Sequence, residues 1–319
     1  MGESSESLRR VCRLGSMSAP LRLVIGFSPG SASDEVARTF APALERALGR
    51  AVSVVLRPGN NGADAAREVA AAKPDGATLF MATLGTHALA PHLAQDLPYD
   101  PLRDFSAVTL VSTAPLVLAC HASLGVSGTR ALIDLARARP RELTYGTSAI
   151  GGAPHLAAEL FQALAGVEMK HVRYAHTGRL YDDLEAGRIA LSFNNMMSML
   201  PRCLNGTLRA LAVTTSARSP SADELPTLAE SGLPGYDLSN WLGVVAPADT
   251  PPLVIDETQA AIAAALTDTA VQATLRRGGV TPCGSTPREF ADFMTREHAR
   301  WGPIVGRFRE AHANAASTT

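Results

Sequence analysis

The segment Leu21–Asp34 reads LRLVIGFSPGSASD, an apolar run of strand length followed by a turn of small residues and the start of a helix. Its first seven residues have the composition of a buried strand, which ends at the turn Ser28-Pro29-Gly30. Ser33 is the predicted N-cap of the helix, and acidic residues in the first turn suit the positive end of the helix dipole. Apolar residues then recur at helical spacing until Gly49. This segment predicts a strand–turn–helix unit.

The same alternation of short apolar runs and helical periods continues along the chain. Further strands are predicted at 52–56, 78–82, 108–111, 116–121, 143–145, 171–174, 189–193 and 208–213, and the segment 241–246 begins a final stretch of the chain. Helices are predicted at 63–72, 129–138, 155–164, around 182–185, and at 253–266, 270–277 and 287–308. Strands that alternate with helices favour parallel sheets covered by helices on both faces, so the fold class is α/β.

Two α/β sets of similar size, followed by a short helical segment, predict two Rossmann-like lobes. We expect residues 1–20 to be a disordered leader, residues 21–115 plus 222–319 to form lobe 1, and residues 116–221 to form lobe 2. The helical C-terminal segment is too small to stand alone, so it is expected to return to lobe 1. Two crossover strands would then join the lobes.

Composition narrows the class of partner. The 319 residues are 46% hydrophobic and 18% charged, with a formal net charge of −1. This balance gives no basic excess for a nucleic-acid backbone, and the chain has no run of 18 apolar residues that would span a membrane. The four cysteines are widely spaced, so isolated buried thiols are expected, with a Cys120–Cys203 disulfide as the alternative in an oxidising compartment.

Two similar loops are the main candidates for a ligand site. Each follows a strand and leads into the first turn of a helix: Gly26–Asp34 in lobe 1 and Gly146–His155 in lobe 2. Unpaired amides at a helix N-terminus attract anions, and small residues let a ligand approach the backbone. Such loops lie at the carboxyl ends of parallel strands, where ligands bind. Facing each other across a cleft, the two loops would hold one small anion.

Catalytic and cofactor motifs are weak by comparison. Gly26-Phe27-Ser28-Pro29-Gly30 matches the nucleophile elbow of hydrolases, but Pro29 lacks the N–H that would complete an oxyanion hole. The sequence contains no dinucleotide-binding or Walker motif and no zinc-ligand spacing, so we expect no cofactor, no metal and no catalytic residue. An enzyme that uses His87 or His155 as a base is the less favoured alternative.

The ordered motifs resemble those of the substrate-binding receptors of tripartite tricarboxylate transporters, also called Bug receptors. The resemblance runs from about Leu21 to about Val305. It is carried by Pro29-Gly30 with Asp34 and Val36-Ala37-Arg38, Arg57-Pro58-Gly59 with Gly62, Pro74-Asp75-Gly76-Ala77-Thr78-Leu79, Gly85-Thr86-His87, Leu97-Pro98-Tyr99-Asp100-Pro101 with Asp104-Phe105, His155-Leu156-Ala157 with Glu159-Leu160-Phe161, residues 208–214, Gly232-Leu233-Pro234-Gly235-Tyr236, and Ala246-Pro247 with Thr250-Pro251.

The resemblance implies a two-lobed periplasmic binding protein of type II that captures a small carboxylate for a membrane permease. It further implies a monomer in the periplasm. The first 20 residues lack the apolar stretch of a secretory signal, which leaves a cytoplasmic location open. A small-molecule sensor or partner-docking protein on the same fold is the alternative function.

The expected ligand-binding residues combine the two loops with positions carried over from the family. In lobe 1 they are Ser28, Gly30, Ser31, Asp34, Thr86 and His87; in lobe 2 they are Thr147, Ser148, Gly151, Gly152, Ala153, Arg179 and Asn194. Backbone N–H groups of Ser31–Asp34, with Thr147, Ser148 and Gly151, are expected to hold one carboxylate. Arg179 is either a bidentate partner for a second carboxylate or a solvated surface residue.

Several positions depart from the family pattern. Ser31 replaces a glycine, Gly152 and Ala153 replace hydroxyl residues, and Asn194 replaces an aspartate. The segment from Tyr174 to Arg179 replaces a more neutral, lysine-containing stretch. Together with the missing secretory signal, these changes predict either a relative with an altered ligand or one that has lost its transport role.

Overall fold

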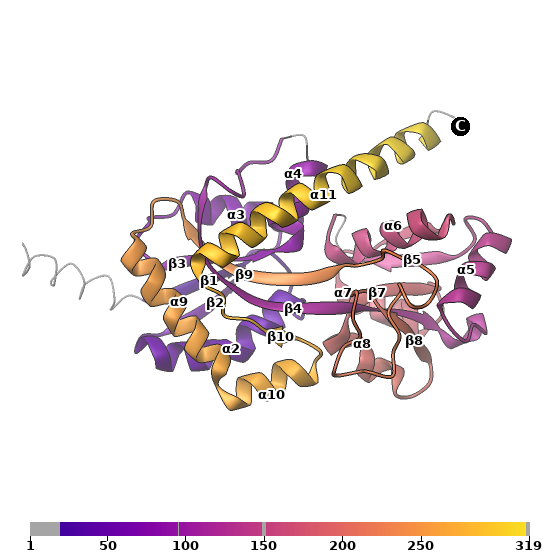
Figure 1. Cartoon of the computed structure of the whole chain (residues 1–319), viewed down its shortest axis with the longest axis horizontal. Helices are drawn as coiled ribbons and strands as arrows, with labels where there is room; N and C mark the ends of the chain where they lie inside the picture. Colours follow the sequence, from indigo (N-terminus) through magenta and orange to yellow (C-terminus); the bar gives the residue numbers. More distant parts are fainter. Residues whose placement is uncertain (1–19, 95, 149–150, 317–319) are drawn as a thin grey trace, which may run out of the picture. The chain divides into compact units, whose positions relative to one another are not determined.

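The computed structural model describes residues 20–94, 96–148 and 151–316 and divides the chain into two compact units. Of the described residues, unit 1 contains those up to Ser112, Leu242–Gln272 and Pro282–Pro303. Unit 2 contains the described residues of Thr113–Trp241, Ala273–Thr281 and the segment 304–316. Strands β4 and β9 run from one unit into the other, as does the long helix α11 (Figure 1).

The sheet of unit 1 is parallel at its centre. Its strands stand in the order β2-β1-β3-β9, where β1 pairs in parallel with β2 and β3, and β9 pairs with β3 in the antiparallel sense. The strands are β1 (Leu21–Ile25), β2 (Val52–Leu56), β3 (Thr78–Thr83) and β9 (Ser239–Pro247). The helices are α2 (Ala32–Leu48), η1 (Asn60–Gly62), α3 (Ala63–Ala70), η2 (Leu84–Leu89), α4 (Ala90–Leu93), α9 (Pro252–Thr267) and the first part of α11 (Pro287–Ala316).

Unit 2 repeats the strand–helix alternation. Strand β5 pairs in parallel with β6 and β7, whereas β4 pairs in the antiparallel sense with β7 and β8. Its elements are β4 (Phe105–His121), η3 (Ala122–Leu124), α5 (Thr129–Ala138), β5 (Thr144–Thr147), α6 (Ala153–Ala165), β6 (Lys170–Arg173), α7 (Thr177–Glu185), β7 (Leu191–Asn195), α8 (Met196–Cys203) and β8 (Leu208–Val213). The short elements α10 (Thr269–Arg277) and β10 (Thr281–Pro282) lie near the boundary between the units in sequence.

The boundary of the second unit differs from the sequence expectation. Residues 222–241 belong to unit 2, although they were expected in lobe 1. Backbone bonds hold this segment to the end of β8: Leu238 N donates to Thr214 O at 2.8 Å, and Val213 N donates to Pro226 O at 2.9 Å. The buried Tyr236 hydroxyl also donates to Ala157 O at 2.7 Å. Residues 273–281 and 304–316 likewise group with unit 2.

Some local elements also differ. The N-cap of α2 is Ser31 rather than Ser33, because Ser31 has extended backbone angles and its Oγ accepts a bond from Asp34 N. The two strands predicted at 108–111 and 116–121 form the single strand β4, in which Pro115 stands just before Leu116, the first residue paired with β7. Helices η2, α4 and α8 were not predicted.

In the described part of the chain, Cys120, Cys203 and Cys283 are free thiols, and no helix there is long and apolar enough to cross a bilayer. Cys12 and the predicted leader up to residue 19 lie outside the described residues. Burial raises the pKa of Cys120 to about 11, which keeps this thiol protonated.

Three loops of unit 1 meet in tight backbone contact at the carboxyl edge of the sheet. A Cβ on Gly26, after β1, would lie 2.5 Å from the Cα of Gly62, which follows β2. A Cβ on Gly62 would in turn lie 2.8 Å from Cγ2 of Thr86, which follows β3, and φ at Gly62 is +90°. Only glycines allow the three strand ends to come this close.

We expect Gly26→Ala to destabilise unit 1, because the new Cβ meets backbone that cannot rotate away. The cost should be about 1–3 kcal/mol, as for other overpacked sites. Gly178→Ala in α7 is the matched control, because a Cβ there meets nothing within 4 Å. The control should be neutral or slightly stabilising. Urea denaturation of both variants is the measurement, and equal stabilities would contradict the tight contact.

Candidate functional site

The first candidate surface is the N-terminus of α2, directly after β1. Several amides there are already used by the protein. Gly30 N donates to Asp34 Oδ2 at 3.0 Å, and Ser31 N donates to Ser28 O at 3.2 Å. Asp34 N donates to Ser31 Oγ at 3.4 Å. These bonds fix the turn and saturate three of the amides in the predicted loop.

The bonds leave two amides of the first helical turn open. Within the described chain, no acceptor is hydrogen-bonded to the backbone N–H of Ala32 or Ser33. Both lie at the positive end of a 17-residue helix, an arrangement that favours a bound anion. Of the four amides from Ser31 to Asp34 that were expected to bind a carboxylate, these two are therefore the ones that the protein does not use itself.

Asp34 does not leave an uncompensated negative charge beside these amides. Its side chain is 7% exposed, and Oδ1 pairs with Arg38 Nε at 2.6 Å while Oδ2 accepts from Gly30 N. The carboxylate shapes the turn and is neutralised by a neighbour four residues along the helix. Asp34 thus supports the loop through its side chain.

Thr86 lies in the third loop of this edge, after β3. It forms a capping box with Thr83: Thr86 N donates to Thr83 Oγ1 at 3.1 Å, and Thr83 N donates to Thr86 Oγ1 at 3.0 Å. Tyr99 OH donates to Thr86 O at 2.7 Å. The Thr86 side chain is fully buried and lies next to Gly62. Its hydrogen bonds therefore stabilise the loop after β3 at the point where it contacts the loop after β2.

His87 is enclosed by aromatic rings. It has no exposed surface, and its ring centroid lies 5.1 Å from that of Phe105, 5.8 Å from that of Phe80 and 6.2 Å from that of Tyr99. Its Nδ1 is 3.0 Å from Thr86 Oγ1, and its Nε2 has no partner among the described residues. Burial lowers the pKa of His87 to about 3, so the ring is neutral. This enclosure gives no support to a role as a base in contact with a ligand.

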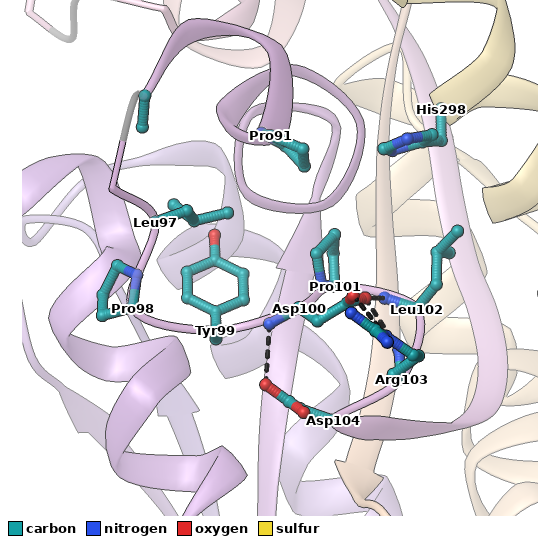
Figure 2. Close-up of a pocket in the computed structure, with 11 residues that line it drawn as sticks. Pro91, Leu97, Pro98, Tyr99, Asp100, Pro101, Leu102, Arg103, Asp104 and His298 are labelled. Atoms are coloured by element: carbon teal, nitrogen blue, oxygen red, sulfur yellow. Dashed lines mark hydrogen bonds and ion pairs between the residues drawn. The ribbon is translucent and has the colours of Figure 1, made fainter.

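A surface hollow of unit 1 lies beside α4 (Figure 2). It is lined by Pro91, Ala94, the segment from Leu97 to Asp104, and His298. Its acids are used internally: Asp100 Oδ2 accepts from Arg103 Nε at 2.7 Å, and Asp104 Oδ2 accepts from Asp100 N at 2.7 Å (Figure 2). Tyr99, one of the lining residues, bonds to Thr86 O. We therefore interpret the residues that line the hollow as a structural support for the loop after β3.

The second candidate surface is the carboxyl edge of the parallel strands of unit 2. Thr147 ends β5 and is fully buried, with its Oγ1 2.6 Å from His171 Nε2. Ser148 Oγ accepts from Thr177 Oγ1 at 3.1 Å, at the start of α7. Thr177 was not among the predicted residues, although its place at the next strand end is a usable sequence signal. Ala149 and Ile150 lie outside the described residues.

The loop reaches α6 through Gly151, Gly152 and Ala153. Gly151 N donates to His155 Nδ1 at 3.1 Å, so this amide, which was expected to bind the ligand, has a partner within the protein. Gly152 is the N-cap of α6 and supplies no side-chain cap. In the described residues, the N–H groups of Gly152 and Ala153 have no protein acceptor. These two amides are the open ones at this helix end.

Asn194 lies at the end of β7, beside β5 in the sheet. It is 3% exposed, and its Nδ2 donates to Ser192 Oγ at 2.7 Å. Ser192 Oγ in turn donates to Gly146 O at 2.8 Å, which ties β7 to β5 below the loop. The Asn194 side chain is therefore held in place at the same edge as Thr147.

Arg179 lies on the outer face of α7. Its side chain is 66% exposed, and its Nε lies 3.4 Å from Asp183 Oδ1. Arg188 Nη2 lies closer to that oxygen, at 2.6 Å, and Tyr174 OH donates to Asp183 Oδ2 at 2.9 Å. The bonds from Arg188 and Tyr174 lower the pKa of Asp183. The Arg179 guanidinium thus has a carboxylate neighbour in its own helix.

Comparison of the sequence with known proteins identifies a family. The sequence profile described as "Tripartite tricarboxylate transporter family receptor" matches residues 36–309. Protein BugT of Bordetella pertussis (strain Tohama I) is 34% identical over 287 residues, which cover 90% of this chain and 88% of BugT.

Two similar solved structures contain ligands. An R. palustris protein solved with adipate is 36% identical, has a TM-score of 0.86, and is matched over 91% of this chain and 96% of its own. MatC from Rhodopseudomonas palustris, with bound malate, is 27% identical, has a TM-score of 0.84, and is matched over 90% and 99%. The similarity confirms the predicted α/β fold of a two-lobed periplasmic binding protein.

The low pKa of His87 gives a testable dependence of stability on pH. Between about pH 6.5 and about pH 3 the unfolded chain binds a proton at His87 and the folded chain does not, so stability falls as the pH falls. The loss should reach about 2–3 kcal/mol from pH 6.5 to pH 4.5. In His87→Phe this part of the loss should disappear. Urea denaturation at both pH values measures it, and an equal loss in both proteins would refute a neutral, buried His87.

Proposed function

The chain belongs to the tripartite tricarboxylate transporter receptor family, and from this premise we propose that it captures a small carboxylate for the membrane subunits of such a transporter and releases it unchanged. Adipate and malate, found in the two similar structures, are both small dicarboxylates. In this proposal the protein is a monomer of the periplasm with no catalytic residue.

The open amides of Ala32 and Ser33 are the observation that carries the proposal. They offer two N–H donors and the positive end of a helix to one carboxylate group. The neighbouring acid, Asp34, is paired with Arg38 and so does not repel an anion. Ser28, Gly30 and Ser31 build the turn that presents the two donors.

In unit 2 we propose that Thr147 and Ser148 bind the ligand together with the open amides of Gly152 and Ala153 and the buried Asn194. All lie at the carboxyl edge of β5 and β7, where ligands bind in sheets of this kind. The mixture of hydroxyl, amide and backbone donors suits carboxylate oxygens, which only accept hydrogen bonds.

Removing one open donor tests this assignment without disturbing the helix. Ala32 is the first residue of α2, where proline is tolerated, and Ser31 already has the extended angles that precede proline. Ala32→Pro should therefore weaken adipate binding about 10-fold or more, since a hydrogen bond to a charged group contributes about 1.5–3 kcal/mol. Calorimetry measures the affinity, and thermal melting should show an intact fold.

Ala32→Gly is the matched control, because it keeps the N–H and should bind as the parent does. The parent itself tests the function: at about 100 times Kd, a carboxylate should stabilise the fold by about 2.7 kcal/mol. If no member of a panel of mono-, di- and tricarboxylates stabilises the parent, the receptor proposal fails. Recovery of a chemically altered acid after incubation would instead indicate an enzyme.

Arg179 is proposed to bind the second carboxylate of a dicarboxylate. Its exposed guanidinium shares Asp183 with Arg188, which leaves further N–H groups for a ligand. Arg179→Ala should then weaken binding of adipate but leave the affinity for a monocarboxylate, such as hexanoate, unchanged. Arg139 is also exposed, so Arg139→Ala is the control for a general loss of positive charge. An equal effect of Arg179→Ala on both acids, or no effect on either, removes this role.

A further inference from the structure

Two histidines stand behind the ligand-binding loop of unit 2 and each bonds to it. His155, in the first turn of α6, accepts the Gly151 amide on Nδ1 at 3.1 Å. His171, in β6, has Nε2 2.6 Å from Thr147 Oγ1. The two ring centroids are 4.7 Å apart. The imidazoles therefore form one packed pair that contacts the loop at both of its ends.

The bond to Gly151 determines where the proton of His155 lies. A backbone N–H only donates, so Nδ1 must be unprotonated and the neutral ring carries its hydrogen on Nε2. That nitrogen is 3.8 Å from Glu159 Oε1, one helical turn along α6. Protonation of Nδ1 would turn the acceptor into a donor and break the bond to Gly151.

The titratable groups around the pair come from three elements. Glu159 of α6 is 7% exposed and accepts bonds from Tyr145 OH and from Gln162 Nε2. Tyr145 of β5 stacks on His171 of β6, with ring centroids 4.9 Å apart. Burial, and next the charge of Glu159, raises the pKa of Tyr145, which keeps its hydroxyl a donor. Glu159 Oε1 thus lies on the Nε2 side of the His155 ring, whereas the bond from the Gly151 amide requires an unprotonated Nδ1.

The bond matters because α6 begins without a side-chain cap. Gly151 has φ of +76° and Gly152 supplies no hydroxyl or carboxylate, so the bond from Gly151 N to His155 Nδ1 is a side-chain bond that ties this turn to the first turn of α6. We propose that neutral His155 is a positioning residue: it holds Gly151 so that the open amides of Gly152 and Ala153 face the ligand, and its protonation weakens ligand binding. The inference rests on the proposed function.

The test uses the full chain, adipate as the probe, and calorimetry between about pH 8 and about pH 6, where carboxylates stay ionised. His155→Phe keeps the ring but removes the acceptor, and should weaken binding about 10-fold or more at pH 8. His155→Asn places a carbonyl oxygen near the position of Nδ1. It should restore affinity close to that of the parent and reduce its loss on acidification.

His121→Phe is the control, because His121 ends β4, which runs antiparallel to β7, and so lies at the opposite edge of the sheet. It should bind as the parent does at every pH. If the parent at pH 8 binds neither adipate nor any other acid of the carboxylate panel, the proposed function itself fails. If the parent binds, then unchanged affinity in His155→Phe, failure of His155→Asn to restore binding, or tighter parent binding at low pH would each overturn the positioning role.

Discussion

The contact between the backbones of Gly26 and Gly62 is the constraint on which unit 1 depends. The loops after β1 and β2 pack so closely on each other that a single Cβ would not fit between them. Thr86, in the loop after β3, packs against Gly62. Parallel pairing puts these three strand ends at one edge. The start of α2 is thereby fixed at the place where the sheet ends, and its open amides have a defined direction.

The proposed binding chemistry follows from which amides the protein uses itself. In unit 1 the turn consumes the N–H groups of Gly30, Ser31 and Asp34 and leaves those of Ala32 and Ser33. In unit 2, His155 consumes that of Gly151. The donors that remain open are therefore few and adjacent, which suits a compact acceptor such as a carboxylate. Buried supports such as His87 and Glu159 hold the loops from behind.

The sequence predicts the α/β alternation well because strands and helices have different periods and their ends carry small residues. It predicts the two strand-end loops for the same reason. It cannot decide which amides are occupied, since Asp34 and His155 bond to backbone groups only in a particular turn geometry. The pairing of Arg179 with Asp183 could have been predicted from the sequence, because Asp183 is four residues along the same helix. The burial of His87 could not have been predicted, because Phe80, Tyr99 and Phe105 surround it only after the chain has folded.

The measurement that most directly tests this account is a backbone-amide NMR titration of the isotope-labelled chain with adipate. The account predicts saturable shifts of the Ala32 and Ser33 amides, as expected for new charge-assisted hydrogen bonds, and smaller shifts of the already bonded Gly30 amide. Saturable binding that leaves Ala32 and Ser33 unshifted would contradict it.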